Sequence, residues 1–157
     1  KPITSAKLSV LVRAICELQA EHAGGERHPA QEETHVRLVL AGNPHTSVSI
    51  LTKLASDESA RVRARVAENP ETPEHLLIKL AEDTDADVRQ GVSENPKLPV
   101  TLLEKLAKDD NEDVRLAIAG NHKVPNAILG SLSEDSNTFV AAAASKTLSE
   151  LASGARS

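Results

Sequence analysis

The sequence repeats itself every 26 residues, and no other feature constrains the fold as strongly. A Val-Arg pair recurs at this interval, at Val36-Arg37, Val62-Arg63, Val88-Arg89 and Val114-Arg115, and a further valine follows at Val140. A fixed period of about 20 to 50 residues is typical of proteins in which similar units stack on their neighbours. We therefore expect a stack of units instead of a closed globule.

Other residue types keep the same register. The aligned sets are Asn43, Asn69, Asn95 and Asn121; Pro44, Pro70 and Pro96, with His122 in the last copy; Pro73, Pro99 and Pro125, with Ser47 in the first copy; Ile50-Leu51, Leu76-Leu77, Leu102-Leu103 and Ile128-Leu129; Leu54, Leu80, Leu106 and Leu132; and Asp57, Asp83, Asp109 and Asp135. So many coincidences in one register indicate a true tandem repeat.

Each unit predicts two short helical segments. In one, Thr72 is placed to cap the free amide groups, and Pro73 suits the first helical position. The apolar residues 76, 77, 80 and 81 then form one stripe. The segment ends in acidic residues, and Asp83 or Asp85 is expected to cap the next one.

The other segment is expected over roughly residues 86 to 94. Val88 and Val92 lie four positions apart, on one face of a helix. The Asn95-Pro96 step ends the segment, because proline disfavours helix in the residue before it. Neither apolar stripe can be buried within one unit, so stacking must bury both.

The predicted fold is an all-α solenoid of about four two-helix repeats in one continuous domain. The repeats occupy residues 36–139. Residues 1–35 are expected to form an N-terminal cap, with a helix over 4–22 and a polar loop containing Gly24, Gly25 and Pro29. Residues 140–157 form a C-terminal cap and tail, with an Ala-rich helix over 137–152 that ends before Gly154.

The unit Val-Arg-x3-Ala-x-Asn-Pro-x-Thr-Pro-x2-Leu-Leu-x2-Leu-Ala-x-Asp, complete over residues 62–83, resembles the leucine-rich repeat variant (LRV) family of bacterial proteins. The resemblance covers residues 36–139 and implies a right-handed superhelix in which α-helices alternate with 3₁₀-helices. The best-known member of that family carries an iron-sulfur domain ahead of its repeats. This chain has only Cys16, whereas such clusters need about four thiolates, so we do not expect the cluster here.

Composition narrows the functional classes. The net charge is -5, and a general nucleic-acid or anionic-membrane surface is normally basic. One phenylalanine and no tryptophan or tyrosine leave few aromatic groups for base stacking. No run of about 18 apolar residues is present, and the single cysteine gives no sign of an oxidising compartment. We therefore expect a cytoplasmic protein without a membrane partner.

Metal and catalytic sites are not expected. The spacing of His22, His28 and His35 matches no tight zinc motif. The acids at positions 83, 85, 87 and 94 imitate a calcium loop, but Val88 stands where that loop needs glycine. No phosphate loop or nucleophile motif appears, and the asparagine row is explained by its turns. The predictions are no enzyme activity and no cofactor.

Arginines are the candidate binding residues. One arginine recurs in every unit, and we call this set the arginine ladder: Arg37, Arg63, Arg89 and Arg115. The ladder has either a structural role, in ion pairs with the aspartates six residues earlier, or a binding role toward acidic side chains or phosphates. Arg61 and Arg65 join Arg63 in a local basic cluster that the other copies lack.

We interpret the chain as a non-catalytic repeat scaffold that binds a protein or peptide of unknown identity. Nucleic-acid binding through the arginine ladder is the alternative. The sequence does not show the oligomeric state or the binding surface. It also leaves open whether the first segment of each repeat, such as residues 86 to 94, is an α-helix or a 3₁₀-helix.

Overall fold

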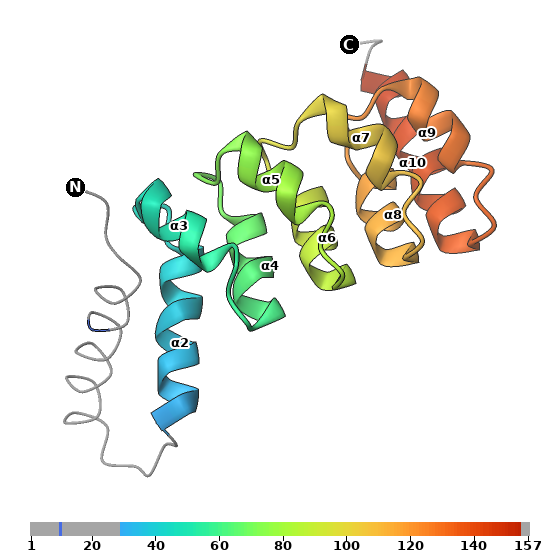
Figure 1. The fold of residues 1–157 in the computed structure, drawn as a ribbon. Coiled ribbons are helices and arrows are strands. Elements are labelled where there is room, and N and C mark those ends of the chain that lie inside the picture. Colours follow the sequence, from blue (N-terminus) through green and yellow to red (C-terminus); the bar gives the residue numbers. More distant parts are fainter. Residues whose placement is uncertain (1–9, 11–28, 155–157) are drawn as a thin grey trace.

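The fold was obtained as a computed structural model that describes residue 10 and residues 29–154. Within these residues the chain forms only helices and no β-strand, which confirms the all-α prediction (Figure 1). In chain order the helices are α2 (Pro29–Gly42), α3 (Val48–Leu54), α4 (Ala60–Glu68), α5 (Glu74–Leu80), α6 (Ala86–Ser93), α7 (Val100–Leu106), α8 (Glu112–Ala119), α9 (Asn126–Leu132) and α10 (Thr138–Gly154).

The helices lie in two rows (Figure 1). We call α2, α4, α6, α8 and α10 the even row, and α3, α5, α7 and α9 the odd row. From α3 onward, successive helices of each row begin 26 residues apart. Each even-row helix packs on the next one in its row, so that segments distant in sequence become neighbours.

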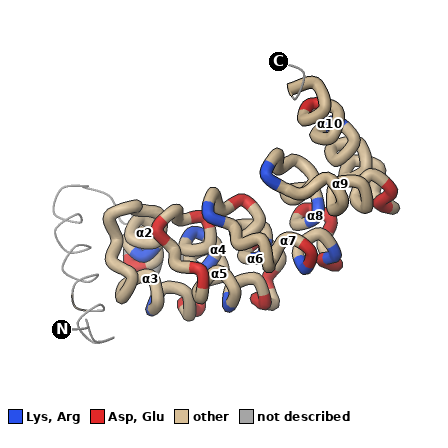
Figure 2. The backbone as a smooth tube through the Cα atoms, turned by 90° about the horizontal axis from the view of Figure 1, so that it is seen from above, with Lys and Arg blue, Asp and Glu red and all other residues tan. Residues whose placement is uncertain are grey.

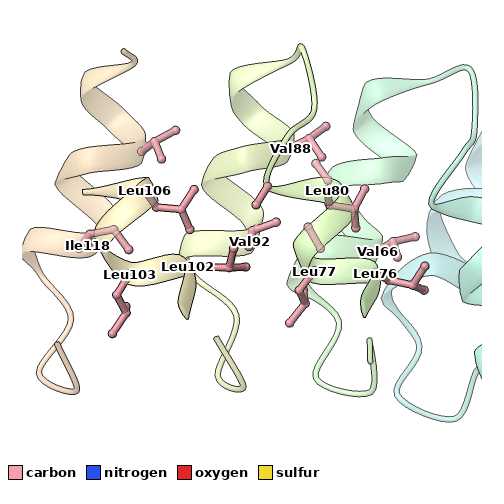
Figure 3. Close-up of a cluster of buried hydrophobic side chains, with 14 of the residues drawn as sticks. Val66, Leu76, Leu77, Leu80, Val88, Val92, Leu102, Leu103, Leu106 and Ile118 are labelled. Carbon is pink, nitrogen blue, oxygen red and sulfur yellow. The ribbon is translucent and has the colours of Figure 1, made fainter. Parts of the chain in front are cut away.

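A continuous aliphatic core runs between the rows. The predicted leucine stripe is buried, since Leu77 is 0% exposed and Leu80 is 1% exposed. Val88 and Val92, on the facing side of α6, are both fully buried. Figure 3 shows these side chains interleaved in layers between neighbouring units. The buried cluster extends from Val36 in α2 to Ala144 in α10.

Helix starts differ in part from the prediction. Asp85 caps α6 as expected, accepting a hydrogen bond from the Asp87 backbone N–H at 2.9 Å. Thr72 does not cap α5, where Pro73 occupies the cap position. The Thr72 hydroxyl instead donates to the Val66 carbonyl at 2.6 Å. The reason is that carbonyls in the last turn of a helix lack the usual donor four residues later. The Val66 carbonyl, in the last turn of α4, therefore accepts the Thr72 hydroxyl as well as the Asn69 backbone N–H at 3.1 Å.

Both rows consist of α-helices in the described part of the chain, so the alternation with 3₁₀-helices that the family resemblance implies is not seen. In the odd row, the Leu77 and Ala81 backbone N–H groups bond to carbonyls four residues earlier, at 3.2 and 2.9 Å. The tighter three-residue bonds occur only at the ends of α5, as at Leu76 and Glu82. Such tightening is common at α-helix termini.

The ends of the stack also differ from the prediction. Pro29, expected in a loop, is the first residue of α2, a position that suits its fixed backbone angle. The expected boundary between residues 35 and 36 therefore falls inside a helix. The last helix reaches Gly154 instead of stopping before it, a difference typical of frayed helix ends. The helix predicted over residues 4–22, Gly24 and Gly25 lie outside the described residues.

We expect Leu77→Ala and Leu103→Ala each to lower the free energy of unfolding by about 2 to 5 kcal/mol, because each substitution leaves a cavity in the core. Ile78→Ala is the matched control, since Ile78 neighbours Leu77 in α5 but is 43% exposed, and it should cost less than about 1 kcal/mol. Urea unfolding followed by circular dichroism measures all three. Equal losses at Leu77 and Ile78 would contradict the packing described above.

Candidate functional site

The arginine ladder is held inside the stack by aspartates. Arg89 Nε donates to Asp109 Oδ2 at 2.8 Å, and Arg89 Nη2 donates to Asp109 Oδ1 at 2.8 Å. Its third nitrogen, Nη1, donates to the backbone carbonyls of Asp83 at 2.8 Å and Thr84 at 3.3 Å. We call this arrangement the Arg–Asp clamp.

The clamp recurs along the stack. Arg63 binds Asp83 at 2.7 and 2.9 Å, and Arg115 binds Asp135 at 2.8 and 3.1 Å. In the first copy Arg37 Nε lies 2.9 Å from Asp57 Oδ2, but it is not aligned for a hydrogen bond. The arginine side chains are only 15 to 18% exposed.

The partner of each arginine differs from the one expected. The sequence suggested the aspartate six residues earlier, in the preceding unit, whereas the paired carboxylate comes from the aspartate 20 residues later, in the same 26-residue unit as the arginine. The earlier aspartate contributes its backbone carbonyl. The physical reason is that the Asp83 carboxylate already binds Arg63, which leaves its carbonyl for Arg89. Each such aspartate therefore joins two successive arginines.

These contacts shift the acidity of the aspartates. The hydrogen bond from Arg63 is the main cause that lowers the pKa of Asp83, and the Asp85 backbone N–H adds to it. Burial alone would raise the pKa of Asp109, but the hydrogen bonds from Arg89 and the Asn111 backbone N–H outweigh it and leave the pKa lowered. Arg115 likewise lowers the pKa of Asp135.

The asparagine row forms a second set of links between units. Asn95 Nδ2 donates to the Ala67 carbonyl at 2.6 Å and to the Asn69 carbonyl at 3.0 Å, both in the preceding unit. Asn69 makes the same two bonds to Ala41 and Asn43. Each of these side-chain oxygens also accepts the backbone N–H two residues later. We call this arrangement the Asn clamp, and its repetition agrees with the structural role predicted for these residues.

Two of the six candidate arginines lie elsewhere, in an open groove across α2, α4 and α6. The groove has a volume of about 560 Å³, and its lining includes Leu38, Val39, Arg61, Ala64, Arg65 and Asp87. Arg61 is exposed and makes no ion pair with any described residue. Arg65 donates to Glu68 Oε2 at 2.8 Å. We call this opening the even-row groove.

Two glycines shape the groove. A Cβ on Gly91 would lie 2.9 Å from the Ala64 carbonyl, so this glycine allows α6 to pack closely on α4. A Cβ on Gly42 would lie 2.9 Å from Arg65 Nε, so the Arg65 side chain lies over α2 at this point. The glycines thus fix both the floor of the groove and the position of one of its cations.

The groove carries charges of both signs. Arg61, Arg65 and Glu68 line it from α4, whereas Asp87 in α6 and Glu94 just after α6 line it on the other side. Figure 2 shows acidic segments beside the basic ones along the whole stack, with no continuous basic face. The groove therefore offers a cation and an anion on adjacent helices, α4 and α6, and the apolar side chains Leu38 and Val39 line it from α2.

The acids that imitate a calcium loop are engaged in other contacts. The Asp83 carboxylate binds Arg63, Asp85 caps α6, and Val88 is fully buried. In the part of the chain that the structure describes, no group of three or more His, Cys, Asp or Glu residues is placed to hold a metal ion. Cys16, His22 and His28 lie outside that part.

The groove itself was not predicted, although the basic cluster that lines it was noted. A usable signal lies in the positions where the copies differ. Position 35 of the first unit corresponds to Arg61, Asp87 and Asp113 in later units, so one surface position changes from histidine to arginine to aspartate along the row.

Comparison with known proteins gave no match to this chain among family models, curated proteins or solved structures. Of the helices in residues 29–154, none combines the length and the apolar character needed to span a membrane.

We expect acid to weaken the stack through the Arg–Asp clamps. An aspartate whose pKa is lowered on folding contributes stability that is fully present above its unfolded pKa, about 3.9. This contribution is lost as the pH falls through the lowered pKa values of Asp83, Asp109 and Asp135. Urea unfolding between about pH 7 and pH 2 should therefore show the free energy of unfolding decreasing from about pH 4 downward.

Asp109→Asn tests the assignment. It should lower the free energy of unfolding at neutral pH by about 1.5 to 3 kcal/mol and make the acid-dependent loss shallower. Glu104→Gln, at an exposed position of α7, is the control and should change neither. An unaltered pH profile in Asp109→Asn would show that the clamp does not contribute to stability.

Proposed function

We propose that this chain is a right-handed α-solenoid of the LRV type that works as a non-catalytic scaffold and binds a polypeptide segment in the even-row groove. One observation carries the proposal. The ladder arginines and the asparagines of two junctions bond within the stack, whereas a charged position that changes from unit to unit, as Arg61 and Asp87, lines the groove without an ion pair among the described residues. Binding at the groove would therefore leave the clamps intact.

The groove favours an extended segment with charges of both signs. Adjacent packed helices lie about 8 to 10 Å apart, so Arg61 and Asp87 present opposite charges at roughly this spacing. Three residues of an extended segment in the polyproline II conformation span about 9 Å and make one full turn, so side chains three positions apart face the same way. A segment with an acidic residue and a basic residue three positions apart would match both groups, and an apolar residue flanking the acidic one, toward α2, would cover Val39, which is 56% exposed.

The LRV assignment rests on the shared unit, on the 26-residue spacing of the helices and on the two-row arrangement. The presence of α-helices in both rows of the described residues is a departure from that family. A cytoplasmic location remains the expectation drawn from the cysteine content.

Nucleic-acid binding through the ladder has weaker support. In Arg63, Arg89 and Arg115 each guanidinium nitrogen already donates to a carboxylate or a carbonyl. A phosphate would have to displace an aspartate from its clamp. The ladder is therefore a set of neutral pairs and lacks the free cations that phosphate contacts require.

Selection of random 12-residue peptides displayed on phage against the full chain tests the proposal. We expect enrichment of peptides with an acidic and a basic residue three positions apart. Binding of the enriched peptides should weaken about tenfold in Arg61→Glu and in Asp87→Lys, because each reversal opposes one peptide charge. Lys108→Glu, at an exposed lysine between α7 and α8, is the control and should bind normally.

Failure to enrich any peptide, or binding that is indifferent to both groove variants, would contradict the proposal. Retardation of a DNA duplex at low salt that is lost in Arg63→Glu, with helical circular dichroism retained, would favour the nucleic-acid alternative.

A further inference from the structure

One junction of the stack lacks its Asn clamp. Asn121 stands in the register of Asn69 and Asn95, and the matching carbonyls of the preceding unit are those of Ser93 and Asn95. Asn121 Nδ2 bonds to neither carbonyl, although Asn121 Oδ1 still accepts the Lys123 backbone N–H at 2.9 Å. At the α2–α4 and α4–α6 junctions, an asparagine makes two such bonds to the preceding unit. The α6–α8 junction lacks the equivalent two bonds.

The departure is confined to this junction within the described stack. At the next one, Thr147 takes the place of asparagine and its hydroxyl donates to the Ala119 carbonyl at 2.8 Å. The Arg89–Asp109 clamp holds the other edge of the α6–α8 junction at 2.8 Å. The junction is thus closed on one edge and open on the other. In agreement, α8, α9 and α10 turn away from the line of α2, α4 and α6 (Figure 2).

The open edge forms a slot of about 440 Å³. Its lining includes Ser93, Leu98, Val100, Leu103, Gly120 and Asn121. The leucines and valine make an apolar wall, and Val100 is 72% exposed. Glu94 borders both the slot and the even-row groove, so the two openings adjoin.

The polar groups of the slot define the ligand. Asn121 Nδ2 is a hydrogen-bond donor and the Ser93 carbonyl is an acceptor, and at the other junctions the equivalent carbonyl is satisfied by an asparagine amide. A group that satisfies both must accept one hydrogen bond and donate another. A carboxamide and a hydroxyl both do this, whereas a carboxylate cannot donate and an ammonium cannot accept. The carboxamide is favoured because an asparagine amide satisfies the equivalent carbonyl at two other junctions.

Charge at the slot also favours a neutral group. Glu94 and Lys123 line it with opposite charges, so neither sign of ligand is preferred overall. From this geometry we propose that the slot binds the carboxamide side chain of a glutamine or asparagine in a partner polypeptide, which completes in trans the Asn clamp missing from this junction. This proposal about the slot depends on the proposed scaffold function in one respect, which is that the ligand is a polypeptide.

The test uses the full chain labelled with ¹⁵N and two short probes. Acetyl-Leu-Gln-Leu dimethylamide carries the carboxamide, and acetyl-Leu-Met-Leu dimethylamide replaces it with an apolar side chain of similar length. We expect the glutamine probe to shift the Asn121 side-chain amide signals saturably and to leave those of Asn69, in the closed α2–α4 junction, unchanged. The methionine probe should bind about tenfold more weakly or worse, because it leaves both polar groups unsatisfied.

Three variants locate the site. Gly120→Leu should abolish binding by filling the slot and should still fold, since Gly120 has an ordinary helical conformation and an added Cβ meets only the Leu116 carbonyl, at 3.7 Å. Asn121→Asp removes the donor and should weaken the glutamine probe about tenfold. Arg61→Glu alters the even-row groove and not the slot, so it should leave binding of the glutamine probe unchanged. This variant therefore distinguishes a wrong proposal for the slot from a wrong proposal for the groove.

Three results would overturn the proposal. One is the absence of an Asn121 shift with the glutamine probe, and another is equal binding of the two probes. The third is slow hydrogen exchange of the Asn121 side-chain amide in the free protein, as slow as that of Asn69, which would mean that the junction is closed in solution.

Discussion

Everything in this structure depends on the burial of aliphatic side chains between neighbouring units. Odd-row helices have seven residues each, far fewer than the roughly 12 to 15 at which an isolated helix becomes even marginally stable. Leu77 and Val92 are fully buried because the helices of adjacent units cover them. The chain can therefore fold only as a stack. Exposed residues do not contribute to this packing, so they can differ from one unit to the next.

The clamps give this stack its register. Apolar packing is not directional, whereas a carboxylate that binds a guanidinium through two hydrogen bonds has one favourable geometry. Asp83 receives Arg63 of its own unit on its carboxylate and Arg89 of the following unit on its carbonyl, so one residue fixes two successive units relative to one another. Where the Asn clamp is absent, at Asn121, the same stack opens into a slot. The same position of the repeat thus links two units where asparagine bonds to the preceding unit, and borders a candidate binding site where it does not.

The sequence allowed the helical stack, its period and its buried stripes to be predicted, because these follow from apolar spacing at residues such as Leu76 and Leu80. It did not identify the carboxylate partner of Arg89, since separation along the chain does not show how one unit is placed on the next. Thr72 was misassigned because a hydroxyl near a helix start is also close to the end of the preceding helix. The groove was anticipated only through Arg61 and Arg65, and the slot not at all, because Asn121 looks like every other asparagine of its row.

Removal of one whole unit tests the account most directly. Deleting residues 62–87 joins Arg61 to Val88 and leaves every remaining unit with equivalent neighbours. The account predicts a folded protein with unchanged helicity per residue, a lower free energy of unfolding, and a urea m-value reduced by about one sixth, in proportion to the surface removed. An unfolded chain, or an m-value that stays the same, would contradict the claim that each unit is stabilised by its neighbours alone.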